Sequence, residues 1–540
     1  MKKSLLTLAT LAFPALMSAQ SAMDAYQFAQ PDLKGTARFM SMGGAFGALG
    51  GDLSTLSQNP GGIGVYRQNE IGFTIDIDAQ QSKAISQGVA TKWDKTPFYL
   101  NNIGCVFSIH NSGVLRNINL GFTYNKTSSF NRRFRGSVPR LGTSVTNYIA
   151  ALANGSGVNV GDVAGNGSFD PYNPTDGGLQ APWATILGYD SYFINARQED
   201  GKAHWDGQFG AGTTGSGYFR VVDKGAMDEY NIALGGNVSN VFYWGMDFGI
   251  VDFSYERNSL WGEQMTGAYV ANSNDEVEQT TSDIQLQSRY RVTGTGFNYK
   301  LGFIVRPVPQ LRIGFAMHTP TWYDLEQSYL GATSSIYGNH RGEEIHYTNG
   351  GYDAVYDYRF RTPWRLIASM AGVIANRFII SADYEWANYR YCHFTDKYDD
   401  NWLNGGYDSF TYTNDDIKNM YQSTSTLRVG AEARVSNNVS LRAGYSLMRA
   451  PVKSDVFDNK EEVFTDGARL DYTLDDRTYY ITGGIGFHHK GFYTDLAYVY
   501  KNRRSEYHPF PSDIAEPAAC PSARVTSANH QVVLSMGFKF

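Results

Sequence analysis

Residues 427–447 read LRVGAEARVSNNVSLRAGYSL, and this stretch decides the fold. Apolar side chains occupy nearly every second position on both sides of Ser436-Asn437-Asn438. A period of two is that of a β-strand with one apolar face, and a short polar stretch between two such segments is typical of a hairpin turn. The stretch therefore predicts two antiparallel strands of about ten residues each.

The same alternation recurs along most of the chain. It predicts strands at roughly 71–78, 103–109, 118–124, 227–238, 242–256, 286–305, 311–319, 354–371, 377–391, 422–435, 439–450, 477–488, 491–503 and 528–540. An even number of such strands, about fourteen here, joined by alternating short turns and long loops, is typical of a transmembrane β-barrel. The fold class expected is therefore all-β, a transmembrane antiparallel barrel.

The connections indicate which end of the barrel faces which compartment. Short turns are expected at Pro307–Gln310, Ile374–Asn376, Ser436–Asn438 and His489–Gly491, whereas long loops lie between the other strand ends. Short turns are periplasmic and long loops face outside in bacterial barrels. The longest loop is expected at 130–225, with one helix-compatible patch at 144–152.

The first residues predict export. An apolar run from Leu5 to Met17 follows Lys2 and Lys3, which is typical of a secretory signal with cleavage near Ala19. Residues 1–19 are therefore expected to be a signal peptide, and residues 68–540 the barrel. With the alternating strands, this predicts a multi-pass β-barrel in the outer membrane of a Gram-negative cell, in contact with its lipid.

Residues 35–66, GTARFMSMGGAFGALGGDLSTLSQNPGGIGVY, precede every strand signal and are too rich in glycine to form a core alone. We interpret residues 20–67 as a hatch, or plug, of short helices in the barrel. Four apolar side chains are candidates for lining a ligand site: Phe39, Met42, Phe46 and Leu49. Packing of the plug against the barrel would require the same residues, so both readings stay open.

Strand parity places charged side chains in the lumen. If Leu427, Val429 and their alternate neighbours face lipid, Glu432 faces inward, because charge on the lipid face costs about 2–4 kcal/mol at mid-depth. Folding the hairpins then predicts three facing sets: Glu432 with Arg442, Arg365 with Glu385 and Asp383, and Lys300 with His318. Such pairs either neutralise a packed lumen or anchor the hatch.

Composition and motifs exclude several classes of function. The formal net charge is −6 and no basic stripe is present, which argues against nucleic acid as a partner. Cys105, Cys392 and Cys520 have no metal-ligand spacing, although Cys392 and Cys520 could pair. The glycine-rich match at Gly210–Gly215 has no strand before it and no helix after it. We therefore expect no catalytic residues, no metal site and no cofactor, and no axial pair for haem stands out.

Several segments together resemble a known family. They are SQNPGGIGVY (57–66), TGTGFNYKLGFIVRPVPQLRIGFAMHTPTWYDL (293–325), FRTPWRLIASMAGVIANRFIISADYEWANYRY (360–391), LRVGAEARVSNNVSLRAGYSL (427–447) and the terminal GFKF. They resemble the FadL-type outer-membrane transporters of long-chain fatty acids and other hydrophobic compounds, including toluene-uptake relatives. The resemblance implies a fourteen-stranded barrel with an N-terminal hatch, and a monomer.

The resemblance also bears on individual residues and on mechanism. Asn59 and Pro60 match the Asn-Pro-Ala hatch motif of the family, and Gly61 stands where the family usually has Ala. Glycine is more permissive, so the stiffness of the hatch is expected to differ. The resemblance implies that ligand enters from outside, that the hatch moves, and that ligand leaves sideways through a gap in the barrel wall.

The function expected is passive uptake of hydrophobic small molecules, with long-chain fatty acids as the default. Two alternatives remain at this stage. One is a surface receptor or adhesin that binds through the 130–225 loop, which is rich in Tyr, Trp, Asn and Gly. The other is a general diffusion porin, against which the apolar, glycine-rich plug argues.

Overall fold

A computed structural model describes residues 21–540 except 166–168, 173–180, 200–201, 272–276, 339, 345–353, 376, 398–409, 459–462, 464, 466 and 512–519. The expected signal peptide, residues 1–19, lies outside the described residues. No described helix has the length and apolar character needed to span a membrane.

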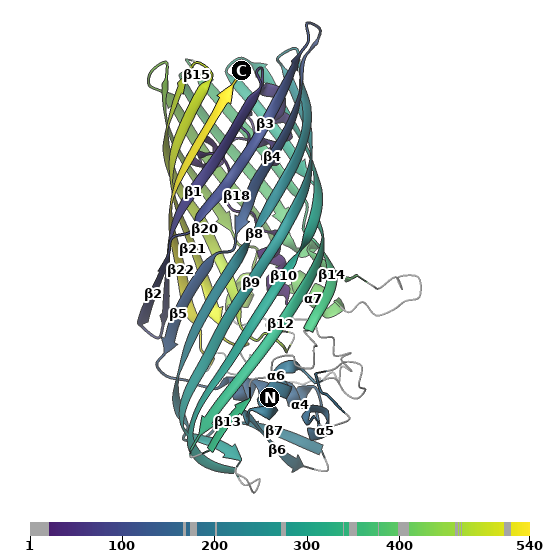
Figure 1. The fold of residues 1–540 in the computed structure, drawn as a ribbon, viewed down its shortest axis with the longest axis vertical. Coiled ribbons are helices and arrows are strands. Elements are labelled where there is room, and N and C mark those ends of the chain that lie inside the picture. The colour runs from purple at the N-terminus through teal and green to yellow at the C-terminus, as the bar shows by residue number, and fades with distance from the viewer. Residues whose placement is uncertain are drawn as a thin grey trace, which may run out of the picture.

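Within the described residues, fourteen antiparallel strands close into one barrel (Figure 1). They are β1 (Glu70–Ser86), β3 (Phe98–His110), β4 (Leu115–Ser129), β8 (Thr214–Val238), β9 (Phe242–Ala271), β10 (Val277–Val308), β11 (Leu311–His318), β15 (Arg365–Ile374), β16 (Phe378–Asn388), β18 (Ser423–Arg434), β19 (Val439–Arg449), β20 (Tyr472–His489), β21 (Phe492–His508) and β22 (Ala523–Lys539). Pairing of β1 with β22 closes the barrel, and Ile71 lies opposite Phe538. The all-β barrel predicted from the alternation is confirmed.

Six further strands extend the wall beyond these fourteen. They are β2 (Val89–Lys95), β5 (Arg132–Val138), β12 (Trp322–Tyr337), β13 (His340–Glu344), β14 (Ala354–Arg361) and β17 (His393–Asp396). Prolines mark several of the breaks: Pro97 separates β2 from β3, Pro320 separates β11 from β12, and Pro363 separates β14 from β15. Proline has no backbone N–H and so interrupts a ladder.

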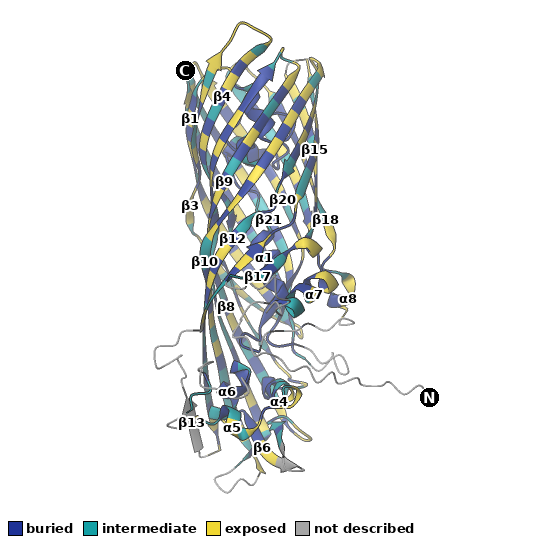
Figure 2. Cartoon of the chain, turned by 90° about the vertical axis from the view of Figure 1, so that its right-hand side faces the viewer, coloured by how far each residue is buried: buried dark blue, intermediate teal, exposed yellow. Residues whose placement is uncertain are grey.

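Burial alternates along the strands, as Figure 2 shows by colour. On β18, Leu427 and Val429 are 44% and 40% exposed, while Arg428 and Glu432 between and beyond them are buried. On β1, Ile71, Phe73 and Ile77 form the corresponding exposed row. The barrel therefore presents an apolar outer surface and keeps its charges inside, as expected for a wall in contact with lipid.

Several strand boundaries predicted from the sequence are wrong. The predicted loop 130–225 includes β5, the start of β8, and a small lobe formed by α4 (Val145–Gly155), α5 (Val160–Val163), α6 (Trp183–Asp190), β6 (Ile194–Glu199) and β7 (Lys202–Gly207). Predicted strand 354–371 is two strands, and 377–391 ends in the short helix η2 (Tyr389–Tyr391). The strands that extend the wall lie beyond the lipid-facing zone. Their outer face need not be apolar there, so apolar and polar residues no longer alternate regularly in the sequence.

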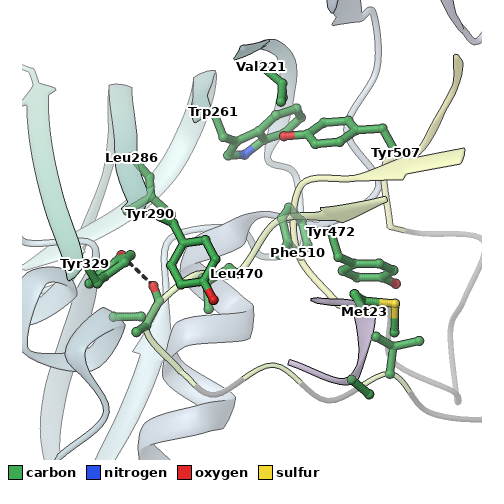
Figure 3. Packing of buried hydrophobic residues seen from close by; sticks show 14 of the residues in the cluster. Met23, Val221, Trp261, Leu286, Tyr290, Tyr329, Leu470, Tyr472, Tyr507 and Phe510 are labelled. Carbon is green, nitrogen blue, oxygen red and sulfur yellow. Dashed lines mark hydrogen bonds between the residues drawn. The ribbon is translucent and has the colours of Figure 1, made fainter. Parts of the chain in front are cut away.

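The loop side of the lumen is filled by aromatic side chains around α1 (Ala22–Ala29). Figure 3 shows part of this cluster, with Tyr290 of β10, Trp261 of β9 and Tyr507 of β21 converging from separate strands. The ring of Phe28 in α1 lies 4.8 Å from that of Phe253. Helices α7 (Thr411–Met420) and α8 (Ser454–Phe457) lie in the later loops. One apolar core thus joins the wall, the lobe and α1.

Cys105, Cys392 and Cys520 form no disulfide with one another. Cys392 is buried against the carbonyl of Ala25, 3.8 Å away, and Cys520 lies 3.7 Å from the carbonyl of Pro511. The disulfide between Cys392 and Cys520 that their loop positions suggested is absent, because each sulfur has its own local partner.

His508 gives the loop end of β21 a predicted pH dependence. It lies ten residues beyond Tyr498, an exposed lipid-facing residue of β21, and its ring stacks on Tyr472 at 4.8 Å. Burial lowers the pKa of His508 from 6.5 to about 4, although Glu506 opposes this shift. The folded state therefore favours the neutral ring, and its stabilisation is present above pH 6.5 and lost as the pH falls towards 4.

Between pH 7.5 and pH 5 the loop ends of β20 and β21 are expected to lose about 2 kcal/mol of local stability. Hydrogen exchange at the two pH values, corrected for the intrinsic rate, measures this loss. His508→Gln should abolish it, whereas His488→Gln at the opposite end of β20 should not. An equal loss in His508→Gln would show that another group is responsible.

Candidate functional site

The plug, residues 21–66, lies in the lumen and contacts most of the barrel wall. It contains α1, α2 (Ala37–Ser41), α3 (Thr55–Gln58) and the 3-10 helix η1 (Pro60–Val65). Local capping explains two of these turns. Thr36 Oγ1 accepts from Phe39 N at the start of α2, and Asn59 Oδ1 accepts from Gly61 N at the start of η1, where Pro60 occupies the first position.

The hatch motif residues Asn59, Pro60 and Gly61 rest directly on the backbone of β10. Asn59 Nδ2 donates to the carbonyl oxygens of Gly47 at 2.5 Å and Phe303 at 3.3 Å. A Cβ placed on Gly61 would lie 2.9 Å from the backbone of Gly302 and Phe303. The motif therefore joins the segment around Gly47 to the segment around Asn59. It also places Gly61 against β10, with no room for a side chain at Gly61.

We predict that Gly61→Ala weakens the contact between the hatch motif and β10 by about 1–3 kcal/mol, because the added methyl group meets rigid strand backbone. Hydrogen exchange of the plug amides at 44–62 is expected to accelerate in this variant, while exchange in the strands stays unchanged. Gly51→Ala is the matched control within the plug, since the nearest atom to its Cβ is 3.6 Å away, although its positive φ adds some strain. Unchanged exchange in Gly61→Ala would show that the close approach carries no energy.

Asp383 of β16 is the main polar anchor of the plug. Its Oδ2 accepts hydrogen bonds from Phe46 N at 3.0 Å, Gly47 N at 2.9 Å and Gln58 Nε2 at 3.2 Å. The carboxylate is 1% exposed, so these bonds are formed away from water. Asp383 forms no ion pair with Arg365; its hydrogen bonds go to the plug instead.

A chain of charged groups joins the plug to the neighbouring strand β18 and on to β19 and β21. Glu432 Oε2 accepts from Arg38 Nε of the plug at 3.0 Å and from Arg442 Nε at 2.7 Å. Arg442 also reaches Asp495 at 2.5 Å. Glu432 and Arg442 lie directly opposite each other in the β18–β19 register. The role of the plug arginine in this set could not be read from strand parity.

The other expected charge sets differ in detail. Arg365 lies opposite Ala387, two residues from the predicted partner, yet its guanidinium still reaches Glu385 at 2.5 Å, which Arg428 also contacts at 2.7 Å. Lys300 and His318 are register partners, but they do not bind each other. Lys300 contacts Glu229 at 2.7 Å, and His318 Nε2 donates to the carbonyl of Gln58 at 2.7 Å. Groups from outside the hairpin, a carboxylate of β8 and a plug carbonyl, bind Lys300 and His318 instead.

A cavity of about 130 Å³ lies between the plug and the wall. Its apolar lining comes mainly from Phe28, Leu33, Phe39, Met227, Val251, Tyr323 and Met448, and its charged lining includes Lys34, Lys126, Lys300, Arg365 and Arg428. Each of these five cations has a carboxylate partner within 2.7 Å. The cavity therefore combines apolar walls with cations that lie in ion pairs, two of which share Glu385.

Of the four plug residues predicted to line a ligand site, only Phe39 lines this cavity. Met42 and Phe46 are fully buried in the packing between plug and wall, and Leu49 faces a different cavity. The sequence could not separate these roles, because packing and ligand binding both require apolar side chains.

The wall beside the cavity is interrupted. The ladder between β3 and β4 runs from His110 and Asn117 to Asn102 and Asn125, and then stops. Beyond it, Lys126–Ser129 of β4 pair only with β8. Lys126 and Thr127 line the cavity at this free strand edge. The cavity thus reaches the wall where backbone hydrogen bonds no longer close it.

Plug residue Asp32 covers the interruption. Its N–H donates to the carbonyl of Thr127 at 2.8 Å, and its Oδ1 accepts from Lys501 Nζ at 2.6 Å and Tyr480 Oη at 3.0 Å. Asp32 and Lys34 also line a second, smaller cavity of about 30 Å³. They therefore separate the two spaces. No sequence signal identified Asp32, because its partners lie almost 100 and 470 residues away.

No group of three or more His, Cys, Asp or Glu side chains in the described part of the chain is placed to hold a metal ion. The cavity between plug and wall can hold a small apolar molecule. A shift of plug residues 31–34 would connect this cavity to the interruption between β3 and β4.

Comparison with solved structures places the fold. A Pseudomonas aeruginosa FadL homologue is 11% identical, with 94% of this chain and 99% of that chain covered, at a TM-score of 0.52. The P. putida toluene transporter TodX is 14% identical over 94% and 99%, at 0.48, and the Ralstonia pickettii toluene transporter TbuX is 12% identical over 94% and 99%, at 0.42. No family model and no curated protein matches the sequence. The chain has the fold of the FadL homologue, which confirms the resemblance at the level of fold.

Proposed function

We propose that this protein is an outer-membrane channel for the passive uptake of hydrophobic small molecules. A molecule enters from the side of the long loops, occupies the cavity beside Phe39, and leaves sideways into the membrane when the plug moves. The protein acts as a monomer and carries out no chemical reaction on its cargo.

The observation that carries this proposal is the contact between the cavity and the interrupted wall. Lys126 and Thr127 line the cavity, and β3 no longer pairs with β4 at their level. A route through the wall requires only that the plug residues at 31–34 withdraw, whereas a route along the axis would require removal of the whole plug. Sideways release also delivers an apolar molecule to lipid, which favours it by about 0.8 kcal/mol per buried CH₂.

The lining supports a hydrophobic cargo. Each of the cations that line the cavity lies in an ion pair, although Arg365 and Arg428 share Glu385, so most of the positive charge at the cavity is already balanced. A cavity of roughly 150 Å³ in another protein holds benzene, so a ring-sized compound fits the closed state here. A long-chain fatty acid, the default expected from the resemblance, needs the plug to move before its whole chain is accommodated.

The membrane placement rests on the outer surface of the barrel. Exposed apolar residues such as Ile232, Ile250 and Phe315 recur on neighbouring strands, with inward-facing polar residues between them. An exposed apolar band on a barrel is stable in lipid and a liability in water. The buried plug argues against a porin with an open polar lumen, and among the described residues of the lobe no contact singles it out as a binding surface.

Filling the cavity tests the proposal. Val251→Phe places a larger side chain in the lining, and Val221→Phe makes the same change at a buried site of the wall that does not line the cavity. Uptake of labelled toluene into cells expressing Val251→Phe is expected to fall about tenfold, a loss of about 1.4 kcal/mol of binding. Equal uptake by both variants, with both barrels folded, would place the route elsewhere.

A further inference from the structure

Three arginines on the outer face of two strands, β5 and β8, surround one tryptophan of β2. The guanidinium carbons of Arg133 and Arg135 on β5 and Arg220 on β8 lie 5.0, 5.6 and 5.3 Å from the ring centre of Trp93 on β2. We call these three arginines the arginine patch. A cation over an indole face is attracted to the ring, so Trp93 holds the three groups in one place.

The patch faces away from the lumen. On β5 the alternate residues Arg132 and Phe134 are buried inside, where Arg132 contacts Asp223 at 3.2 Å. On β8 the neighbours of Arg220, Phe219 and Val221, belong to the aromatic core. Arg135 and Arg220 are exposed. The arginine patch therefore lies on the outer surface. It belongs neither to the contacts that hold the plug nor to the cavity.

The positive charge of the patch has no acidic partner. Arg135 lies directly opposite Arg220 in the β5–β8 register, and like charges placed opposite each other destabilise a sheet. No carboxylate in the described part of the chain lies within 4.0 Å of any of the three guanidinium groups. Nε of Arg133 is buried and has no acceptor. By contrast, the exposed Arg289 and Arg359 on other strands contact Glu256 and Asp324.

The patch lies just beyond the lipid-facing zone, on the side of the long loops. Phe98 on β3 is 62% exposed, and Trp93 is five residues further along the same edge of the wall. Five residues span about 16 Å of strand, or about 12 Å along the barrel axis at the usual tilt. Since an extended arginine reaches several ångströms further, the patch is within reach of lipid head groups in the outer leaflet.

We propose that the arginine patch binds the phosphate of a phosphorylated lipid in the outer leaflet. Guanidinium groups pair with phosphate through two parallel hydrogen bonds, and three of them held around one indole ring form a positive surface that suits a single anion. The site has a consequence for the wall, because β2 and β5 share no backbone pairing. The cation–π contacts of Trp93 with the three arginines join β2 to β5 and β8, and the bound phosphate offsets the mutual repulsion of the arginines at this contact. This inference depends on the outer-membrane placement proposed above.

The test compares binding of bisphosphorylated lipid A and dephosphorylated lipid A to the detergent-solubilised full chain by native mass spectrometry. The triple variant Arg133→Gln/Arg135→Gln/Arg220→Gln is expected to bind the bisphosphorylated lipid about tenfold less tightly than the parent. The control Arg289→Gln/Arg359→Gln/Arg477→Gln removes the same charge from arginines that have carboxylate partners, and should stay within about twofold. Arg135→Gln alone, at an exposed position, should give an intermediate loss.

Three outcomes would overturn the proposal: equal binding by the triple variant and the parent, equal binding of the dephosphorylated lipid, or displacement of the lipid by millimolar inorganic phosphate alone. A shift in heat-modified gel mobility shows whether each barrel is folded, and Arg135→Gln decides the matter if the triple variant does not fold. The assay involves no uptake, so a failure here leaves the proposed transport intact, and a failure of transport leaves this site testable.

Discussion

Asp383→Ala is expected to make the barrel at least about tenfold more permeable to hydrophilic sugars. The change leaves Gly47 N without its acceptor in a buried site, whereas Phe46 N and the Gln58 amide keep only their bonds to the carbonyl of Gly44. An unsatisfied buried donor costs about 1–3 kcal/mol, so the seated plug loses at least that much relative to a displaced one. Swelling of proteoliposomes in an isotonic sugar solution measures the resulting leak.

Two controls define this result. Asp324→Ala removes an exposed carboxylate that contacts Arg359 at 3.4 Å, and it should leave the sugar leak unchanged. Asp383→Asn keeps one acceptor oxygen and should fall between the parent and Asp383→Ala. If Asp383→Ala leaked no more sugar than the parent, the hydrogen bonds to Asp383 would not hold the plug. Packing against the wall would then have to keep the plug in place.

Asp32→Ala is expected to speed uptake of hydrophobic compounds about tenfold while leaving the sugar leak low. The substitution leaves Lys501 buried without its 2.6 Å partner, a state that costs about 3–5 kcal/mol and favours withdrawal of the plug segment from β4. Initial rates of toluene uptake into proteoliposomes give the measurement. The anchors at Asp383 and Glu432 remain, so the axis of the barrel stays closed.

The combination of rates decides what Asp32 does. Faster toluene uptake with an unchanged sugar leak would show that Asp32 keeps the lateral exit at the edge of β4 closed. A parallel rise in both rates would mean that Asp32 holds the plug as a whole. Slower uptake would contradict the side route, because opening the edge of β4 could then not be the limiting step.

The barrel could be predicted from residues 427–447 because strand parity is a local property. A period of two and a short polar turn fix which side chains face lipid, and the observed exposure of Leu427 and Val429 follows. The extracellular lobe could not be predicted in this way. Its helices and strands have no lipid to face, and their burial depends on contacts such as that of Ser144 with Glu263, 119 residues away.

The candidate site was predictable only in part, for a related reason. Parity placed Lys300 and His318 side by side, but Glu229 from β8 and the carbonyl of Gln58 from the plug bind them instead. Both partners come from segments that are not neighbours in the hairpin. Gly61 was expected to alter the stiffness of the plug. The structure gives it another constraint, since the backbone of Gly302 leaves no space for a Cβ.

The most direct test of the account is uptake of a labelled hydrophobic compound and of a sugar of similar size by cells that lack their own barrel transporters. Cells expressing the full chain are compared with cells expressing a form without residues 21–60. We predict saturable uptake of toluene and of a long-chain fatty acid but not of sugar by the full chain, and entry of sugar once the plug is deleted. Equal passage of sugar through the full chain, or no passage of either hydrophobic compound, would contradict the account.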